Sequence, residues 1–290
     1  MSYRSVFRPE LFRQRTVIIT GGGSGIGRCT AHELASLGAA LALLGRKPDK
    51  LDAVREEIAA AFPQARVTCH ACDIREETAV RETVAAVITE HGRIDGLFNN
   101  AGGQFPSPLK DISLKGWETV VRNNLTGGFL MARECYTQWM EQNGGAIVNV
   151  IADMWNGMPG MGHSGAARAG MLNFTETAAC EWAGAGVRVN AVAPGWIASS
   201  GFDTYPVEFQ ALTKTLKRKV PLQRFGTESE VSAAVVFLLS EAAAFVTGAC
   251  LRIDGGVPNA RHTWPLTSHK RSQPYNGFPL YRPPAWMADE

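Results

Sequence analysis

The chain has 290 residues, of which 45% are hydrophobic and 19% charged, and its formal net charge is +2. This length and apolar content suffice for one large hydrophobic core, while the charge is too small and too evenly spread to favour nucleic acid or membrane binding. No stretch reaches the roughly 18–20 apolar residues of a membrane span, and MSYRSVFRPELFRQRTVIIT lacks the apolar core of a signal peptide. We therefore expect a cytoplasmic protein.

Short apolar runs with strand composition alternate along the chain with segments of helical length. The runs cover residues 16–20, 40–44, 67–72, 96–100, 146–151, 187–194 and 249–253. Amphipathic segments such as KLDAVREEIAAAF separate them, which is typical of parallel β-α-β crossovers. The pattern predicts an α/β protein: a single-domain, Rossmann-type, doubly wound parallel sheet of about seven strands with helices on both faces. We assign residues 1–256 to this domain and residues 257–290 to a tail rich in proline and aromatic residues.

The six cysteines follow no repeated spacing, so we expect free thiols rather than a disulfide framework. Cys69 and Cys72 form the one local pair. They lie in a run of strand composition, which would point residues three apart to opposite faces. We therefore expect no metal site.

A glycine-rich turn follows the first apolar run. In TGGGSGIG, Gly21, Gly25 and Gly27 allow a tight turn, close approach of the backbone to a pyrophosphate, and packing of helix on sheet. Ser24 and Ile26 lie in the same turn. The position after a strand and before a helix predicts a dinucleotide-binding site.

The end of the second run decides which dinucleotide is bound. A carboxylate at this place would bind the adenosine ribose 2′-hydroxyl, but the sequence has Arg46 and Lys47. A guanidinium and an ammonium suit a 2′-phosphate, so we expect NADP(H). The alternative is that both side chains belong to a solvated basic turn.

Five motifs together resemble the short-chain dehydrogenase/reductase family across residues 15–256. They are the glycine-rich turn, Asp73, the Asn99-Asn100-Ala101-Gly102 segment, Asn124 in RNNLTGG, and Pro194-Gly195. The resemblance implies that Asp73 and its neighbour Ile74 meet the adenine, that Asn100, Ala101 and Gly102 brace the cofactor wall, and that Pro194, Gly195 and Ile197 lie near the nicotinamide amide.

The catalytic residues that this family usually carries are mostly replaced. Ala152 stands at the place of the usual Ser, Ser164 at that of the Tyr, and Arg168 at that of the Lys, so that Asn124 alone remains of the usual four. An aliphatic hydroxyl is far too weak an acid to replace the activated phenol in alcohol–carbonyl chemistry. Arg168 can still anchor the nicotinamide ribose.

Hydride addition to the β-carbon of an α,β-unsaturated thioester fits the residues that remain. This step forms an enolate and needs a hydrogen-bond donor for the oxyanion more than a strong acid, a role that suits Ser164. The segments HSGAARAG and NAGGQFPSP are similar to the peroxisomal-type trans-2-enoyl-CoA reductases and their 2,4-dienoyl-CoA reductase relatives. The substrate would then be an acyl thioester, and we expect coenzyme A as its carrier.

Several residues near the expected site have two interpretations. Asp153 and His163 are expected on the substrate side of the site, where each is either catalytic or merely solvated. Tyr205 lies in the segment that is expected to close over the substrate, and it is either the proton source or a packing residue of that segment. The same region contains a basic cluster that consists of Lys214, Lys217, Arg218 and Lys219. We expect it either to bind the phosphates of coenzyme A or to be an ordinary exposed helix end. A set of apolar residues lines an acyl slot or fills core; it comprises Trp155, Met158 and Met161.

Three functions therefore remain open. The first is an NADPH-dependent enoyl-thioester reductase, the second a dehydrogenase of a long apolar or terpenoid alcohol or aldehyde such as citronellol or citronellal, and the third a catalytically silent cofactor-binding partner protein. The resemblance also implies a homotetramer, with a dimer as the alternative. In the family the main subunit interface is formed by the helix that Arg168 is expected to open, AGMLNFTETAACEWAGAG. The aromatic tail is expected on a neighbouring subunit or, alternatively, on its own.

Overall fold

The sheet has seven parallel strands in the order β3-β2-β1-β4-β5-β6-β7. The computed structural model describes residues 3–199, 215–260, 266–278, 284 and 287. The strands are β1 Thr16–Thr20, β2 Ala40–Gly45, β3 Val67–Ala71, β4 Gly96–Asn99, β5 Gly145–Val150, β6 Val187–Pro194 and β7 Cys250–Ile253. Each expected apolar run forms a strand whose ends differ from the prediction by no more than one residue, and the predicted doubly wound fold is confirmed.

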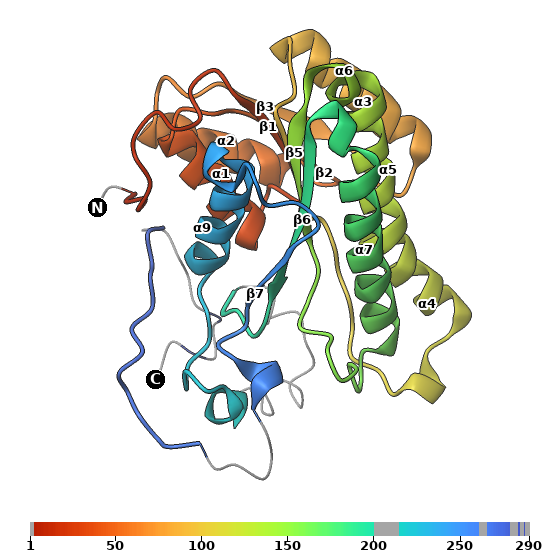
Figure 1. The fold of residues 1–290 in the computed structure, drawn as a ribbon, viewed down its shortest axis with the longest axis vertical. Helices are drawn as coiled ribbons and strands as arrows, with labels where there is room; N and C mark the ends of the chain where they lie inside the picture. The colour runs from red at the N-terminus through yellow and green to blue at the C-terminus, as the bar shows by residue number, and fades with distance from the viewer. Residues whose placement is uncertain (1–2, 200–214, 261–265, 279–283, 285–286, 288–290) are drawn as a thin grey trace.

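Helices cover both faces of this sheet (Figure 1). On one face lie α1 (Gly25–Ser36), α2 (Pro48–Ala61) and α9 (Glu228–Leu239), and on the other α3 (Glu77–His91), α5 (Gly127–Cys135) and α7 (Gly162–Glu181). The remaining α-helices are α4 (Leu114–Val121) and α6 (Glu141–Asn143). Shorter helical turns are η1 (Leu109–Asp111), η2 (Arg122–Thr126), η3 (Tyr136–Met140), η4 (Ala183–Ala185), η6 (Lys217–Lys219), η7 (Glu241–Ala243) and η8 (Val257–Asn259). None of the helices in the described part of the chain has the length and apolarity that crossing a bilayer demands.

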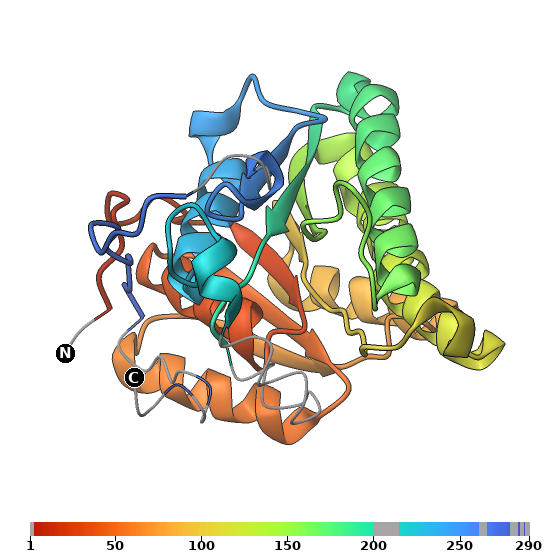
Figure 2. The same ribbon diagram turned by 90° about the horizontal axis from the view of Figure 1, so that it is seen from below.

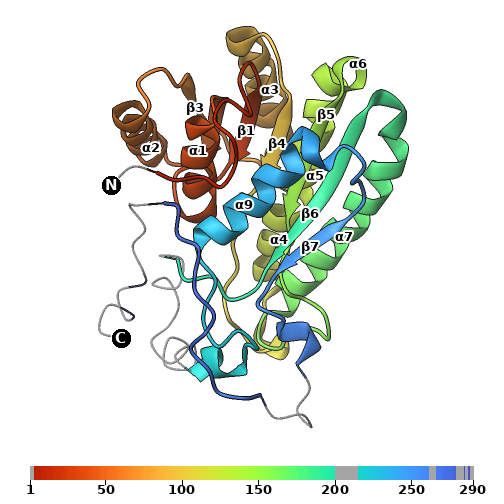
Figure 3. The ribbon, with the colours of Figure 1, turned by 60° about the vertical axis from the view of Figure 1, so that its left-hand side comes forward.

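Two hydrophobic cores lie between these layers, one on each face of the sheet. All five residues of β1 are buried, since this strand is covered on both faces. Strands with such covering consist of nearly continuous apolar residues rather than alternating ones. Figure 3 shows the sheet from β3 to β7, with α9 crossing its front.

The order of the strands fixes where a ligand can bind. The chain winds outward from β1 through β2 to β3, then returns to add β4 on the other side of β1. At such a switch point two neighbouring connections lead to opposite faces of the sheet, which leaves a crevice at the carboxyl ends of the strands. Figure 2 looks onto this end of the molecule.

Helix α7 begins earlier than the sequence indicates. The expected start at Arg168 is wrong, because the helix already begins at Gly162. The glycines suggested a loop, yet Gly165 lies inside the helix, where a Cβ would come within 3.3 Å of Met158. Close packing therefore accounts for this glycine. Ser164 and Arg168 consequently lie one helical turn apart on the same face.

The carboxyl-terminal tail packs on its own chain over the residues that the structure describes. Phe278 is fully buried, with its ring 4.7 Å from the His32 ring and its backbone N–H donating to Ser229 Oγ. The Arg28 guanidinium lies 4.7 Å from the centre of the Phe278 ring. The tail thus joins α1 to α9, and the expected placement on a neighbouring subunit is wrong for this part of it.

Candidate active site

The glycine-rich turn between β1 and α1 has the backbone geometry that a dinucleotide needs. Gly21 and Gly25 have positive φ angles of 67° and 57°, which favour glycine. At Gly27 a Cβ would lie 2.4 Å from the carbonyl oxygen of Gly21, so only glycine lets α1 start this close to the strand. These three positions leave backbone N–H groups at the amino end of a helix, where phosphate binds.

Asn100 ties this turn to the neighbouring strand. Its Nδ2 donates to the carbonyl oxygens of Thr20 and Gly21 at 3.0 and 3.3 Å. Thr20 Oγ1 in turn accepts from the backbone N–H of Ala101 at 2.9 Å. The segment that the family resemblance assigned to the cofactor wall therefore holds the glycine-rich turn in place.

A cavity of about 330 Å³ opens beside the turn. Most of the predicted cofactor residues line it, namely Gly21, Ser24, Ile26, Arg46, Lys47, Asp73, Ile74, Asn100, Ala101 and Gly102. Lys50 also lines the cavity and was missed by the sequence analysis; its position three residues after Lys47, at the start of α2, was the available signal. The donor set fits a dinucleotide, with three cations at the end of β2.

Asp73, which also lines this cavity, stays negatively charged at neutral pH. Arg75 donates to its two carboxylate oxygens at 2.8 and 2.5 Å. These hydrogen bonds lower the pKa of Asp73 to about 2. Arg75 was not expected from the sequence, and it fixes the orientation of the carboxylate next to the proposed adenine site.

Arg168 lies buried at the end of β5, and no carboxylate among the described residues pairs with it. Its Nη1 donates to the carbonyl oxygen of Val150 at 2.5 Å, and a Cβ on Gly102 would come within 2.7 Å of its Nη2. Its Nε is buried without a hydrogen-bond partner in the part of the chain that the structure describes. Burial lowers the pKa of Arg168 to about 10, so the group stays cationic at neutral pH. An unsatisfied buried guanidinium suits the hydroxyl groups of a ribose.

Ser164 is fully buried, and its hydroxyl donates to Gln104 Oε1 at 2.5 Å. Gln104 lies in the loop after β4, and Asn124 holds that loop: its Nδ2 donates to the Gly103 carbonyl at 2.8 Å and its Oδ1 accepts from the Gly103 N–H at 2.9 Å. Asn124 itself sits in the π-helical turn η2, a distortion often found at functional sites. Gln104 was missed as a site residue.

His163 is buried rather than solvated. Its Nδ1 accepts from the backbone N–H of Ser164 at 2.9 Å, and its ring meets Phe105 edge to face at 4.5 Å between centroids. This leaves the proton on Nε2, which lacks a hydrogen-bond partner within the described ranges. His163 therefore belongs to the wall of the site behind Ser164.

Asp153 lies beside the Pro194-Gly195 segment, where its backbone N–H donates to the Pro194 carbonyl at 3.2 Å. It is half-buried, and this burial, reinforced by the Asp254 carboxylate, raises the pKa of Asp153. Gly195 packs so closely on β7 that a Cβ would lie 2.8 Å from the Cα of Asp254. Ile197 is buried next to this segment and bridges to Gly226.

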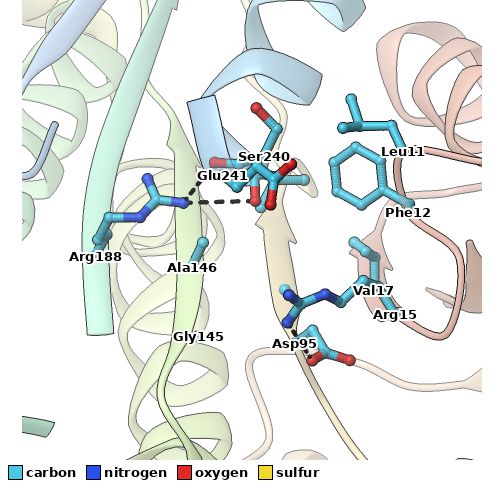
Figure 4. A pocket seen from close by; sticks show the side chains of 12 residues that line it. Leu11, Phe12, Arg15, Val17, Asp95, Gly145, Ala146, Arg188, Ser240 and Glu241 are labelled. Atoms are coloured by element: carbon cyan, nitrogen blue, oxygen red, sulfur yellow. Dashed lines mark hydrogen bonds and ion pairs between the residues drawn. The ribbon is translucent and has the colours of Figure 1, made fainter. Parts of the chain in front are cut away.

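Of the other predicted residues, Met161 is buried and Trp155 packs beneath the Arg252 guanidinium, 5.4 Å from the ring centre. Tyr205 and Lys214 lie outside the described residues. Another cavity, of about 180 Å³, lies at the amino ends of β1, β4 and β5, where Arg188 donates to the carbonyls of Leu238 and Ser240 at 2.8 and 3.1 Å (Figure 4). Arg188 thus caps the end of α9, and this cavity lies at the end of the sheet opposite to the switch point.

Comparison with known proteins places the chain in a family. Residues 21–258 match the family described as Enoyl-(Acyl carrier protein) reductase. The chain belongs to the short-chain dehydrogenase/reductase family and is an oxidoreductase of this type, whose members use a nicotinamide cofactor.

Its relatives include reductases of unsaturated thioesters. A probable 2,4-dienoyl-CoA reductase of Bacillus subtilis is 35% identical over 84% of this chain and 96% of its own length. A peroxisomal 2,4-dienoyl-CoA reductase of Danio rerio is 34% identical over 88% of this chain and 85% of its own. A solved structure described as a citronellol catabolism dehydrogenase of Pseudomonas aeruginosa is 59% identical, with a TM-score of 0.79, and covers 88% of this chain and all of its own.

Proposed function

We propose that the protein reduces an α,β-unsaturated acyl thioester, of the 2-enoyl-CoA type, with NADPH. The observation that carries this proposal is the buried Ser164–Gln104 pair, which takes the place of a phenol next to Arg168. NADPH supplies a hydride. The substrate accepts it at the β-carbon, and the electron pair of the double bond moves to the thioester oxygen.

Ser164, oriented by Gln104, would donate a hydrogen bond to the thioester oxygen. In the structure the Ser164 hydroxyl donates to Gln104 Oε1. When this hydroxyl turns to the thioester oxygen, the Gln104 amide can reverse and donate to Ser164 Oγ, so the donating hydroxyl remains oriented. A developing oxyanion in a buried site gains most from such a fixed donor. Asn124 acts as a positioning residue, because it holds the Gly103 backbone.

The α-carbon is then protonated by water or by an acid of this site. Asp153 is our candidate among the described residues, because burial and Asp254 raise its pKa and favour the protonated form. Tyr205, whose position the structure does not describe, stays the alternative expected from sequence. Arg168 anchors the nicotinamide ribose and remains charged throughout.

Arg46, Lys47 and Lys50 support NADPH as the cofactor, since the three cations line the cavity at the end of β2. Arg46→Ala should reduce the preference for NADPH over NADH at least about tenfold, because one charge-assisted contact to a phosphate contributes about 1.5–3 kcal/mol. Fluorescence titration of both cofactors measures this ratio. A wild-type protein that binds both cofactors equally would refute the assignment.

A second candidate is the dehydrogenation of a terpenoid alcohol such as citronellol. The 59% identity to the citronellol catabolism dehydrogenase favours it. The site argues against alcohol dehydrogenation, because this reaction needs a group that accepts the alcohol proton. The phenol that usually does so in the family is replaced by Ser164. A homotetramer in the cytoplasm is part of our proposal in either case.

The two candidates are separated by NADPH oxidation at 340 nm against enoyl-CoA, dienoyl-CoA and citronellal. We expect turnover with the thioesters and little with the aldehyde. Turnover with citronellal alone would establish the second candidate, and no turnover despite NADPH binding would indicate a catalytically silent partner protein.

A further inference from the structure

A large cavity separates two basic parts of the chain. Its volume is about 910 Å³, and it lies between residues 217–227, here called the basic segment, and residues 266–276, here called the tail segment. Lys217 and Arg218 line it from one side, and His269 and Lys270 from the other. In Figure 3 the dark blue tail passes beside the cyan turn η6 on its way up toward α1.

Both segments contain basic residues but no acidic residues. Residues 209–227 include Lys217, Arg218, Lys219 and Arg224 but no Asp or Glu. The tail is similar, because residues 255–288 contain Lys270 and Arg271 among their basic residues and again no Asp or Glu. Two segments far apart in sequence therefore bring positive charge to the same cavity.

Side-chain hydrogen bonds from the basic segment hold the tail segment in place. Arg224 Nε donates to Ser272 Oγ at 2.9 Å, and Thr227 Oγ1 donates to the Tyr275 carbonyl at 2.6 Å. The Arg224 charge is already balanced, since Glu230 accepts from it at 2.6 Å. Arg224 thus fixes the tail rather than binding a ligand.

Arg218 and Lys270 remain without a carboxylate partner among the residues that the structure describes. Both are exposed, and they line the cavity from its two sides. The phosphate oxygens of a multivalent anion in the cavity can accept charge-assisted hydrogen bonds from such side chains.

The cavity adjoins the cofactor site. Ala198 lines this cavity, while the next residue, Ser199, lines the cofactor cavity. The two cavities therefore meet at consecutive residues of one segment. The tail segment lies beyond residues 21–258, which match the family, so this half of the cavity belongs to the chain's own extension.

We propose that this cavity binds the phosphorylated nucleotide of a coenzyme A thioester, with Arg218 and Lys270 donating to its phosphate oxygens. The inference rests on the proposed function, because it assigns the carrier part of the same substrate. It extends that function by giving the carboxyl-terminal tail a role in substrate selection.

The first test compares two substrates with the same acyl chain, an enoyl-CoA and the enoyl thioester of N-acetylcysteamine, which lacks the nucleotide. In Arg218→Ala/Lys270→Ala, kcat/KM for the CoA thioester relative to the truncated thioester should fall about 100-fold, or about tenfold for each charge-assisted hydrogen bond lost. Arg81→Ala, an exposed base on α3, is the matched control. A ratio in the double variant equal to those of the wild type and this control would overturn the proposal.

The second test does not depend on turnover. Adenosine 3′,5′-bisphosphate is titrated into the NADPH-loaded protein by calorimetry, so that the cofactor cavity is already filled. Binding to the wild type and at least tenfold weaker binding to the double variant would support the cavity, even if no thioester were reduced and the proposed function failed. Equal binding to both proteins, no binding to the wild type, or equal binding of inorganic phosphate would overturn it.

Discussion

Ser164 and Arg168 occupy the positions at which the family usually has a catalytic Tyr and Lys. Arg168 keeps the positive charge and, at 9% exposure, is shielded from water beside Val150 and Gly102. Ser164 keeps a hydroxyl in the same region but cannot exchange a proton near neutral pH. We therefore propose that Ser164 stabilises an oxyanion and that Arg168 holds a ribose, and we expect little alcohol oxidation.

The Ser164 hydroxyl is the first residue to test. Ser164→Ala should lower kcat on an enoyl thioester by roughly 10²-fold, the usual scale for one oxyanion donor. Gln104→Leu should have a similar effect, and the double variant should be little worse than either single one if the two side chains act as a unit. Ser36→Ala, remote on α1, serves as the control. Wild-type kcat in Ser164→Ala would exclude the oxyanion role.

Most residues that line the proposed cofactor cavity were predictable from sequence, whereas the proposed oxyanion pair was only half predictable. Gly21, Gly25 and Asn100 belong to a local motif whose geometry follows from backbone constraints. Gln104 became visible only in the fold, because its contact with Ser164 joins residues 60 positions apart. No spacing rule in the sequence reports such a contact.

At the level of elements, the strands were predicted well because each is a mainly apolar run that alternates with a segment of helical length. The start of helix α7 was predicted wrongly, since its first turn contains two glycines, Gly162 and Gly165, that pack closely on Leu109 and Met158. The tail was the least predictable element. Its proline and aromatic content indicated a surface to lie on, but only the packing of Phe278 on α1 and α9 shows which surface.

Phe278→Ala should destabilise the protein by about 3 kcal/mol, as expected for removal of a fully buried aromatic ring. The denaturation midpoint in urea, compared at equal protein concentration, measures this effect. Phe245→Ala is the matched control, because Phe245 is fully exposed, and it should change stability by less than about 0.5 kcal/mol. Equal effects of the two substitutions would show that the tail does not anchor the fold.

At the level of the whole molecule, aromatic residues gather on α5, the following turn η3, and α7 with its C-cap residue Trp182. Phe129 meets Phe174 edge to face at 5.8 Å, and Tyr136 stacks on Trp182 at 4.4 Å. Phe129 remains partly exposed, at 37%. An aromatic surface of this kind is common at subunit contacts, and it supports the proposed homotetramer.

Glu228 makes the stability of the molecule depend on pH. It is buried at the start of α9, near the glycine-rich turn, and burial raises its pKa to about 7. Its native pKa thus exceeds its unfolded value, so its contribution to stability is complete below pH 4.5 and is lost as the pH rises toward 7. Glu228→Gln should be more stable than the wild type at pH 8, by on the order of 2–3 kcal/mol, and nearly equal to it at pH 4.5. Melting curves at the two pH values measure this difference, and a constant difference would contradict the assignment.

The most direct measurement of the central claim traces the hydride. The protein is incubated with NADPH deuterated at C4 of the nicotinamide, an enoyl-CoA and citronellal together, and the products are separated and analysed by mass spectrometry and NMR. The account predicts deuterium at the β-carbon of a saturated thioester. Deuterium at C1 of citronellol, with the thioester unchanged, would contradict it.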